Sequence, residues 1–242
     1  MNVAKFSLLL VLGFVWAREA AAVDCAQQRD AHATYVVCRV PATRLQLAYA
    51  GTDGKRFESF AALRDSLAHA GRRLVFAMNA GMFHPDFRPV GLLVIDGHSI
   101  APINRASGTG NFFLQPNGVF LVDAAGARVL AADDYRGMTP ALATQSGPML
   151  VHRGQVPAIS AFRESSRSRH IRNGVCASTP QEAVFVISDD AVTFLEFADF
   201  FRKSLGCDEA LYLDGSISSL YSTQLGRADH HSALGPMFFM SE

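Results

Sequence analysis

The sequence predicts an α+β protein, a single domain with a large mixed β-sheet and a few packing helices. Apolar runs of strand length, such as Leu74–Met78 and Ala183–Ile187, recur along the chain and indicate buried strands. Two amphipathic segments follow residues that cap helices, Ser59 and Thr193. Closely spaced turn residues between these two units indicate antiparallel hairpins.

Length and composition agree with one large domain. The chain has 242 residues, of which 49% are hydrophobic, and this is enough for a sizeable core. Its 22 basic and 22 acidic residues give a formal net charge of zero. Because the chain carries no overall positive charge, nucleic acid and membrane surfaces are not expected as partners. We find no linker and no solenoid repeat, so residues 23–242 are expected to form the domain.

Residues 1–22 are predicted to be a secretory signal peptide. Lys5 precedes an apolar stretch from Phe6 to Trp16, and the alanines at 20–22 suit cleavage before Val23. The apolar stretch is too short to span a bilayer comfortably, although an uncleaved anchor or a buried N-terminal helix is the alternative. The sequence therefore predicts a soluble exported protein, periplasmic or secreted, with no stable membrane anchor after cleavage.

Four cysteines remain after the predicted cleavage, and an even number in an exported chain indicates disulfides. Three pairings are possible. We favour Cys25–Cys38 and Cys176–Cys207, because each closes a modest loop between neighbouring segments. No spacing typical of zinc ligands is present, so neither a metal nor another cofactor is predicted.

The same order of elements occurs twice. A helix capped by Ser59 leads to a strand that ends at Asn79, and a capping box opened by Thr193 starts a helix leading to a strand that ends at Asp214. If these strands lie side by side and point the same way, Asn79 and Asp214 share one rim of the sheet, where ligands often bind. The alternative is that Asp214 and Gly215 merely form a turn.

The other strands are predicted from apolar runs bounded by turn residues. Hairpins are expected at Asp96-Gly97 and Asn117-Gly118, where Asp96 and Asn117 are interpreted as turn formers. The expected strands are Tyr35–Val40, Leu45–Tyr49, Leu92–Ile95, His98–Ile100, Phe112–Leu114, Val119–Val122, Arg128–Leu130 and Pro148–Val151.

A basic segment runs from residue 163 to residue 176 of this neutral chain. Its cations are Arg163, Arg167, Arg169, His170 and Arg172, and the opposing charge is Glu164. A guanidinium binds phosphate oxygens through paired donors, so the segment is a candidate anion site. A solvated basic loop is the alternative.

Four motifs together resemble the phosphodiester glycosidase domain family, the family of the lysosomal uncovering enzyme, and in particular its bacterial exported branch. The motifs are Asn79-Ala80-Gly81-Met82-Phe83, Thr144-Gln145-Ser146-Gly147-Pro148, Arg172-Asn173-Gly174-Val175 and Leu213-Asp214-Gly215-Ser216-Ile217-Ser218-Ser219-Leu220-Tyr221. The resemblance runs in order from about residue 45 to the C-terminus. It implies a hydrolase that cleaves the bond between a sugar anomeric carbon and a phosphodiester, with a sugar-phosphodiester or an envelope glycopolymer as substrate.

The resemblance also implies roles for individual residues. Arg172 would hold the phosphate, Asp214 would act as nucleophile, electrostatic stabiliser or general base, and Asn79 would bind sugar hydroxyls or the phosphate. Further substrate-binding positions are expected at Gly81, Ser146, Asn173, Gly215 and Ser218. A glycosidase usually uses two carboxylates, and the best second candidate is Asp86 beside His84, unless both simply lie in a surface loop.

A hypothesis from another class stays open. The same residues could form a non-catalytic module that binds anionic or phosphate-containing glycans. The two hypotheses differ for Asp214→Asn, which would abolish turnover in an enzyme but at most change affinity in a binding module.

Overall fold

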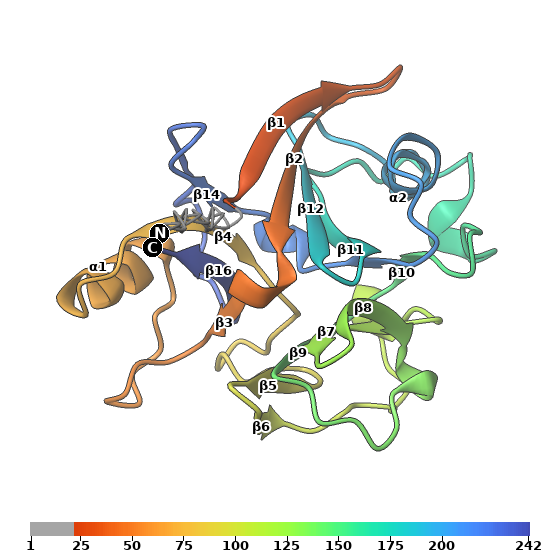
Figure 1. Cartoon of the computed structure of the whole chain (residues 1–242). Helices are drawn as coiled ribbons and strands as arrows, with labels where there is room; N and C mark the ends of the chain where they lie inside the picture. Colours follow the sequence, from red (N-terminus) through yellow and green to blue (C-terminus); the bar gives the residue numbers. More distant parts are fainter. Residues whose placement is uncertain (1–21) are drawn as a thin grey trace, which may run out of the picture.

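The computed structural model describes residues 22–242. The predicted signal peptide, residues 1–22, therefore lies outside the described residues except for Ala22. Within the described part of the chain, no helix is both long and apolar enough to cross a membrane. The protein is mostly β, with three sheets and two α-helices packed into one domain-like body (Figure 1).

All strand pairs in the three sheets are antiparallel. The six-stranded sheet has the order β1 (Asp24–Arg29), β2 (Thr34–Pro41), β12 (Glu182–Ser188), β11 (Asn173–Thr179), β13 (Ala210–Tyr212), β10 (Met149–Val151). A five-stranded sheet has the order β15 (Arg227–Ala228), β14 (Leu220–Ser222), β4 (Leu74–Asn79), β16 (Met237–Ser241), β3 (Gln46–Ala48). The other five-stranded sheet has the order β6 (His98–Ala101), β5 (Leu93–Ile95), β9 (Leu142–Ser146), β7 (Gly118–Asp123), β8 (Gly126–Ala131).

The expectation of one large mixed sheet is wrong, and two inserted strands explain why. Helix α1 (Phe60–His69) connects β3 to β4, which run in the same direction, but β16 lies between them. Helix α2 (Phe194–Asp199) likewise connects β12 to β13, with β11 between them. Each helix therefore connects two strands that run in the same direction but are separated by a strand from elsewhere in the chain, and the three sheets contain no parallel pair.

Both predicted helix starts are confirmed. The Ser59 hydroxyl accepts a hydrogen bond from the Ala62 amide at 3.1 Å and caps α1. Thr193 and Glu196 form the capping box of α2, and the chain then continues as a π-helix over Phe200–Ser204. Helix α1 packs on the sheet that contains β4, whereas α2 packs on the six-stranded sheet (Figure 1).

Most of the predicted strands are present, although β1, β9, β11, β14, β15 and β16 were not predicted. The predicted strand Phe112–Leu114 is wrong, because Asn111–Phe113 forms a 3-10 turn. The buried Asn117 holds this turn by donating from Nδ2 to the Phe112 carbonyl oxygen at 3.0 Å. Strand β7 therefore forms its hairpin with β8, which follows it in the chain.

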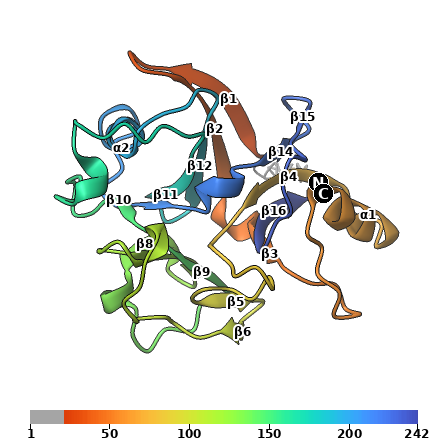
Figure 2. The ribbon, with the colours of Figure 1, turned by 180° about the vertical axis from the view of Figure 1, so that it is seen from behind.

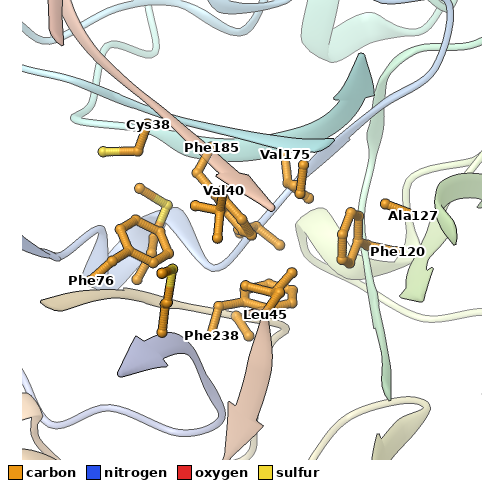
Figure 3. Packing of buried hydrophobic residues seen from close by; sticks show 14 of the residues in the cluster. Cys38, Val40, Leu45, Phe76, Phe120, Ala127, Val175, Phe185 and Phe238 are labelled. Carbon is orange, nitrogen blue, oxygen red and sulfur yellow. The ribbon is translucent and has the colours of Figure 1, made fainter. Parts of the chain in front are cut away.

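Aromatic side chains from all three sheets meet at the centre of the core (Figure 3). The ring of Phe238 in β16 lies 5.3 Å from that of Phe120 in β7 and 4.9 Å from that of Phe185 in β12, between centroids. The Phe76 ring of β4 lies 5.2 Å from Phe185. Burial of these rings stabilises the contact between the sheets and so fixes where the strand ends meet.

Both predicted disulfides are present. Cys25–Cys38 joins directly opposed residues of β1 and β2, and Cys176–Cys207 joins β11 to the segment that follows the π-helix. Disulfides of this kind are typical of proteins outside the cytoplasm.

Candidate active site

The ends of β4 and β13 meet where two sheets join. The Asp214 amide donates to the Ala80 carbonyl oxygen at 3.1 Å, and Asn79 Nδ2 donates to the Asp214 carbonyl oxygen at 2.8 Å. The two strands are not neighbours in one sheet, as a shared rim would require. Asn79 and Asp214 still meet, but across the junction between the two sheets. Figure 2 shows this junction from behind, with β4 and β14 on one side and β11 on the other.

Two buried amide side chains tie this junction together. Asn79 Oδ1 accepts from the Ser219 amide at 2.9 Å and from Asn173 Nδ2 at 3.0 Å. Both asparagines are fully buried, so their polar groups are used within the fold. The predicted site residues Asn79 and Asn173 therefore connect β4, β11 and the chain entering β14.

Ser218 belongs to the same buried cluster. Its Oγ lies 3.0 Å from Asn173 Oδ1 and 3.2 Å from the carbonyl oxygens of Ile171 and Gly215. Its single proton has three acceptors within reach, so this hydroxyl links the turn after Asp214 to the start of β11.

The Asp214 carboxylate forms no ion pair with a cation of residues 22–242. It caps a 3-10 turn over Gly215–Ile217, and its Oδ1 accepts from the Ser216 amide at 3.3 Å. The side chain is half-buried, and burial raises the pKa of the carboxyl to about 6, although the Ser216 hydrogen bond acts in the opposite direction. A carboxylate that titrates near neutrality is suited to acid–base chemistry.

Arg172 is buried, with a side chain only 1% exposed. Its guanidinium donates to the carbonyl oxygens of Val192 and Ser168 at 2.9 and 3.0 Å, and lies 3.7 Å above the Phe194 ring. Within residues 22–242 no carboxylate pairs with it, and burial lowers its pKa. The site thus contains an uncompensated positive charge that lies inside the protein rather than on its surface.

Tyr212 lies between Arg172 and the turn after Asp214. Its hydroxyl oxygen accepts from Arg172 Nη1 at 3.1 Å. A Cβ atom at position 215 would lie 1.7 Å from this oxygen, so Gly215 has to be a glycine. Sequence analysis missed Tyr212, because an aromatic residue in an apolar strand is normally part of the core.

The Thr144–Pro148 motif packs against the chain that follows β4, at Gly81. A Cβ at Gly81 would lie 2.4 Å from both the Gln145 carbonyl oxygen and Thr144 Oγ1, so a glycine is required for β9 to pack this closely. Ser146 is fully buried, and its hydroxyl has no partner within the described residues. Gly81 and Ser146 were both predicted to bind substrate, and the structure places them in the packing between sheets.

His84 and Asp86 lie in an exposed loop after Gly81. Asp86 pairs with Arg88 at 2.6 Å, and the Arg88 hydrogen bonds lower the pKa of the Asp86 carboxyl. This is the opposite of what a general acid needs, so the geometry favours a surface loop for Asp86.

The basic segment is divided between surface and interior. Arg163, Arg167, Arg169 and His170 are exposed, and Arg172 alone is buried. Arg167, Arg169 and Glu196 of α2 line a pocket of about 520 Å³, in which Arg169 pairs with Glu196. Among residues 22–242, no group of three or more His, Cys, Asp or Glu side chains is placed to hold a metal ion.

The fold resembles solved structures of low sequence identity. It matches the catalytic domain of zebrafish N-acetylglucosamine-1-phosphodiester alpha-N-acetylglucosaminidase, auto-inhibited by its pro-peptide, with TM-score 0.63 and 13% identity over 91% of this chain and 82% of that chain. It also matches a putative exported protein from Burkholderia pseudomallei, with TM-score 0.53 and 12% identity over 86% of this chain and 74% of that one.

Sequence comparison gives stronger relationships. The chain is 33% identical over 224 residues to the uncharacterized protein YigE of Escherichia coli K12, which covers 91% of this chain and 86% of that protein. Residues 72–234, which include all four motifs, match the family described as phosphodiester glycosidase. The protein therefore belongs to the phosphodiester glycosidase family.

Proposed function

We propose that the protein hydrolyses the bond between the anomeric carbon of a sugar and a phosphodiester, with Asp214 as the essential carboxylate. The family is named for this reaction. The observation that carries the proposal is the half-buried Asp214 side chain, which has no cation partner in the described chain and a pKa raised to about 6. Structural ion pairs hold carboxyl pKa values low, so this environment favours a functional role.

The chemistry of the leaving group explains how one well-placed carboxylate is enough. A phosphate departs readily as an anion, so it needs less protonation than the alcohol released from an ordinary glycoside. What remains is to stabilise the positive charge that develops at the anomeric carbon and to activate water. Above pH 6 the Asp214 carboxylate is mostly ionised and suits these tasks as nucleophile, electrostatic stabiliser or general base.

Arg172 is proposed to act on the phosphate by its charge. A buried guanidinium without a carboxylate partner creates a positive potential that water screens little. This potential favours the diester anion in the site and the additional negative charge that forms as the phosphate leaves. Asn79, Asn173 and Ser218 are proposed to position the turn that carries Asp214, since their polar groups bond to one another.

The proposed site of action is outside the cytoplasm. The two disulfides and the likeness of the fold to a putative exported protein support this location. Sugar-phosphodiesters or envelope glycopolymers are the proposed substrates, and periplasm or extracellular medium the proposed compartment.

The test is release of reducing sugar from a panel of sugar-1-phosphodiesters by the mature protein. Asp214→Asn preserves shape and the hydrogen bond from Ser216, and we expect it to lower kcat at least about 100-fold. The matched control is Asp133→Asn, which changes an exposed carboxylate in the 3-10 turn after β8 and should leave kcat unchanged. Failure of the wild type to release sugar from any diester, with binding of anionic glycan retained, would instead support the non-catalytic module.

A further inference from the structure

Tyr212 is the buried titratable group at the junction to which the proposed reaction gives no task. It is the last residue of β13, two positions before Asp214, and its side chain is almost fully buried. The Phe194 ring packs edge-on against it at 4.6 Å between centroids. This packing fixes the ring and aims the hydroxyl at Gly215, where a Cβ would lie only 1.7 Å away.

The hydroxyl of Tyr212 uses only part of its hydrogen-bonding capacity. Its oxygen accepts from Arg172 Nη1 at 3.1 Å. Its proton has no acceptor among residues 22–242, although buried hydroxyl groups normally donate a hydrogen bond. Burial raises the pKa of the phenol, so at neutral pH the group keeps its proton and remains a donor.

Arg172 uses three of its five N–H donors inside the protein. Three of its nitrogens bond to Val192, Ser168 and Tyr212, and the side chain is 1% exposed. Of these partners, only the Tyr212 hydroxyl also contacts the turn that begins at Asp214. The phenol therefore connects the guanidinium to the turn that carries Asp214.

We propose that Tyr212 donates its phenolic O–H to the phosphate of the bound diester and so brings the charge of the buried Arg172 to bear on the substrate. This inference rests on the proposed function. A guanidinium bonded to the phenol oxygen polarises the O–H and strengthens the hydrogen bond that it gives to an anion. The proton stays on the phenol, and the bond strengthens as negative charge builds on the departing phosphate.

The test compares Tyr212→Phe with Tyr35→Phe in the mature protein. Both variants remove one hydroxyl from a buried tyrosine, but the Tyr35 hydroxyl has no partner in the described chain, and its ring packs on Phe200 rather than on Phe194. The first measurement is the dissociation constant of dimethyl phosphate, determined by ³¹P NMR titration. We expect the dissociation constant to rise about 10-fold for Tyr212→Phe and to stay unchanged for Tyr35→Phe.

The second measurement is hydrolysis of two substrates with the same sugar, a 1-phosphodiester and a nitrophenyl glycoside that has no phosphate. We expect Tyr212→Phe to lower kcat/KM about 10- to 100-fold for the phosphodiester and less than about 3-fold for the nitrophenyl glycoside. A purely structural role would lower both rates equally.

The outcomes separate this inference from the proposed function. Equal binding of dimethyl phosphate by wild type and Tyr212→Phe, or no binding by either, overturns the role of Tyr212. Loss of binding in Tyr212→Phe alone, in a protein that hydrolyses no phosphodiester, supports the phosphate contact and overturns the proposed reaction. Hydrolysis that is indifferent to Tyr212→Phe supports the reaction and overturns the contact.

Discussion

At position 214 the fold holds a carboxylate in surroundings that oppose its charge. Burial raises the pKa of Asp214 from 3.8 to about 6, and the Ser216 amide offsets only part of this effect. Because the folded state binds the proton more tightly than the unfolded chain, the carboxyl stabilises the fold below about pH 4 relative to higher pH. That contribution is lost as the pH rises through about 6, so at neutral pH ionised Asp214 weakens the fold.

Asp214→Asn should therefore stabilise the protein at neutral pH while it removes activity. We expect the free energy of unfolding to rise by roughly 1 to 3 kcal/mol at pH 8 and to change little at about pH 3, where the wild-type carboxyl is mostly protonated in both states. Urea denaturation at the two pH values measures this. An equal effect at both pH values would mean that charge at position 214 is not the cause.

At the residue scale the sequence identified Asp214 correctly as a strand-end carboxylate, because Asp-Gly after an apolar run is a local pattern. It did not reveal that Arg172 is buried, because burial depends on Phe194 and Val192 of a segment that follows much later. For the same reason Tyr212 looked like an ordinary core residue, since its link to Arg172 forms only between β11 and β13.

At the element scale the junction depends on strand ends rather than on whole strands. Asn79 ends β4, Asn173 begins β11 and Ser219 directly precedes β14, and hydrogen bonds join all three. These contacts let three short strands from two sheets hold one turn, and that turn carries Asp214. The cluster is buried, so each of its polar groups depends on the others.

Asn79→Ala should weaken the fold and displace this turn. It removes the acceptor of the Ser219 amide, the 2.8 Å donor to the Asp214 carbonyl oxygen and one of the two acceptors of Asn173 Nδ2, and we expect the free energy of unfolding to fall by roughly 2 to 4 kcal/mol. Chemical denaturation measures this, with the exposed Gln181→Ala as a control expected to change stability little. A near-neutral Asn79→Ala would show that the amide cluster does not support the junction.

The elements themselves were predictable where their signals are local. Ser59 and Thr193 mark helix starts because capping acts within one turn, and both starts are as predicted. The arrangement of the sheets was not predictable, since β16 and β11 insert between strands that are joined by helices. Nothing within the short apolar runs indicates which distant strand will lie between them.

At the scale of the whole molecule, two disulfides and a shared aromatic core hold three sheets together. Cys25–Cys38 fastens the edge strand β1 to β2, and Cys176–Cys207 fastens β11 to the chain that leads into β13. The second bridge lies in the same strand as Asn173, so it restrains the strand that supports the site.

Removal of either disulfide should lower stability measurably. For closed loops spanning 13 and 31 positions, we expect losses of about 3 and 4 kcal/mol for Cys25→Ser/Cys38→Ser and Cys176→Ser/Cys207→Ser respectively. Urea denaturation of each double variant measures these losses. Reduction of both disulfides in the wild type should also lower the free energy of unfolding. Unchanged stability after complete reduction would show that the core alone holds the sheets.

The proposed reaction breaks the carbon–oxygen bond at the anomeric centre and not the phosphorus–oxygen bond. Hydrolysis of a sugar-1-phosphodiester in water enriched in ¹⁸O, followed by mass spectrometry of the released phosphate monoester, tests this most directly. Attack at the anomeric carbon predicts a phosphate product without the label, formed by the wild type and lost in Asp214→Asn. A labelled phosphate monoester would rule out the proposed reaction, because water would then have attacked phosphorus.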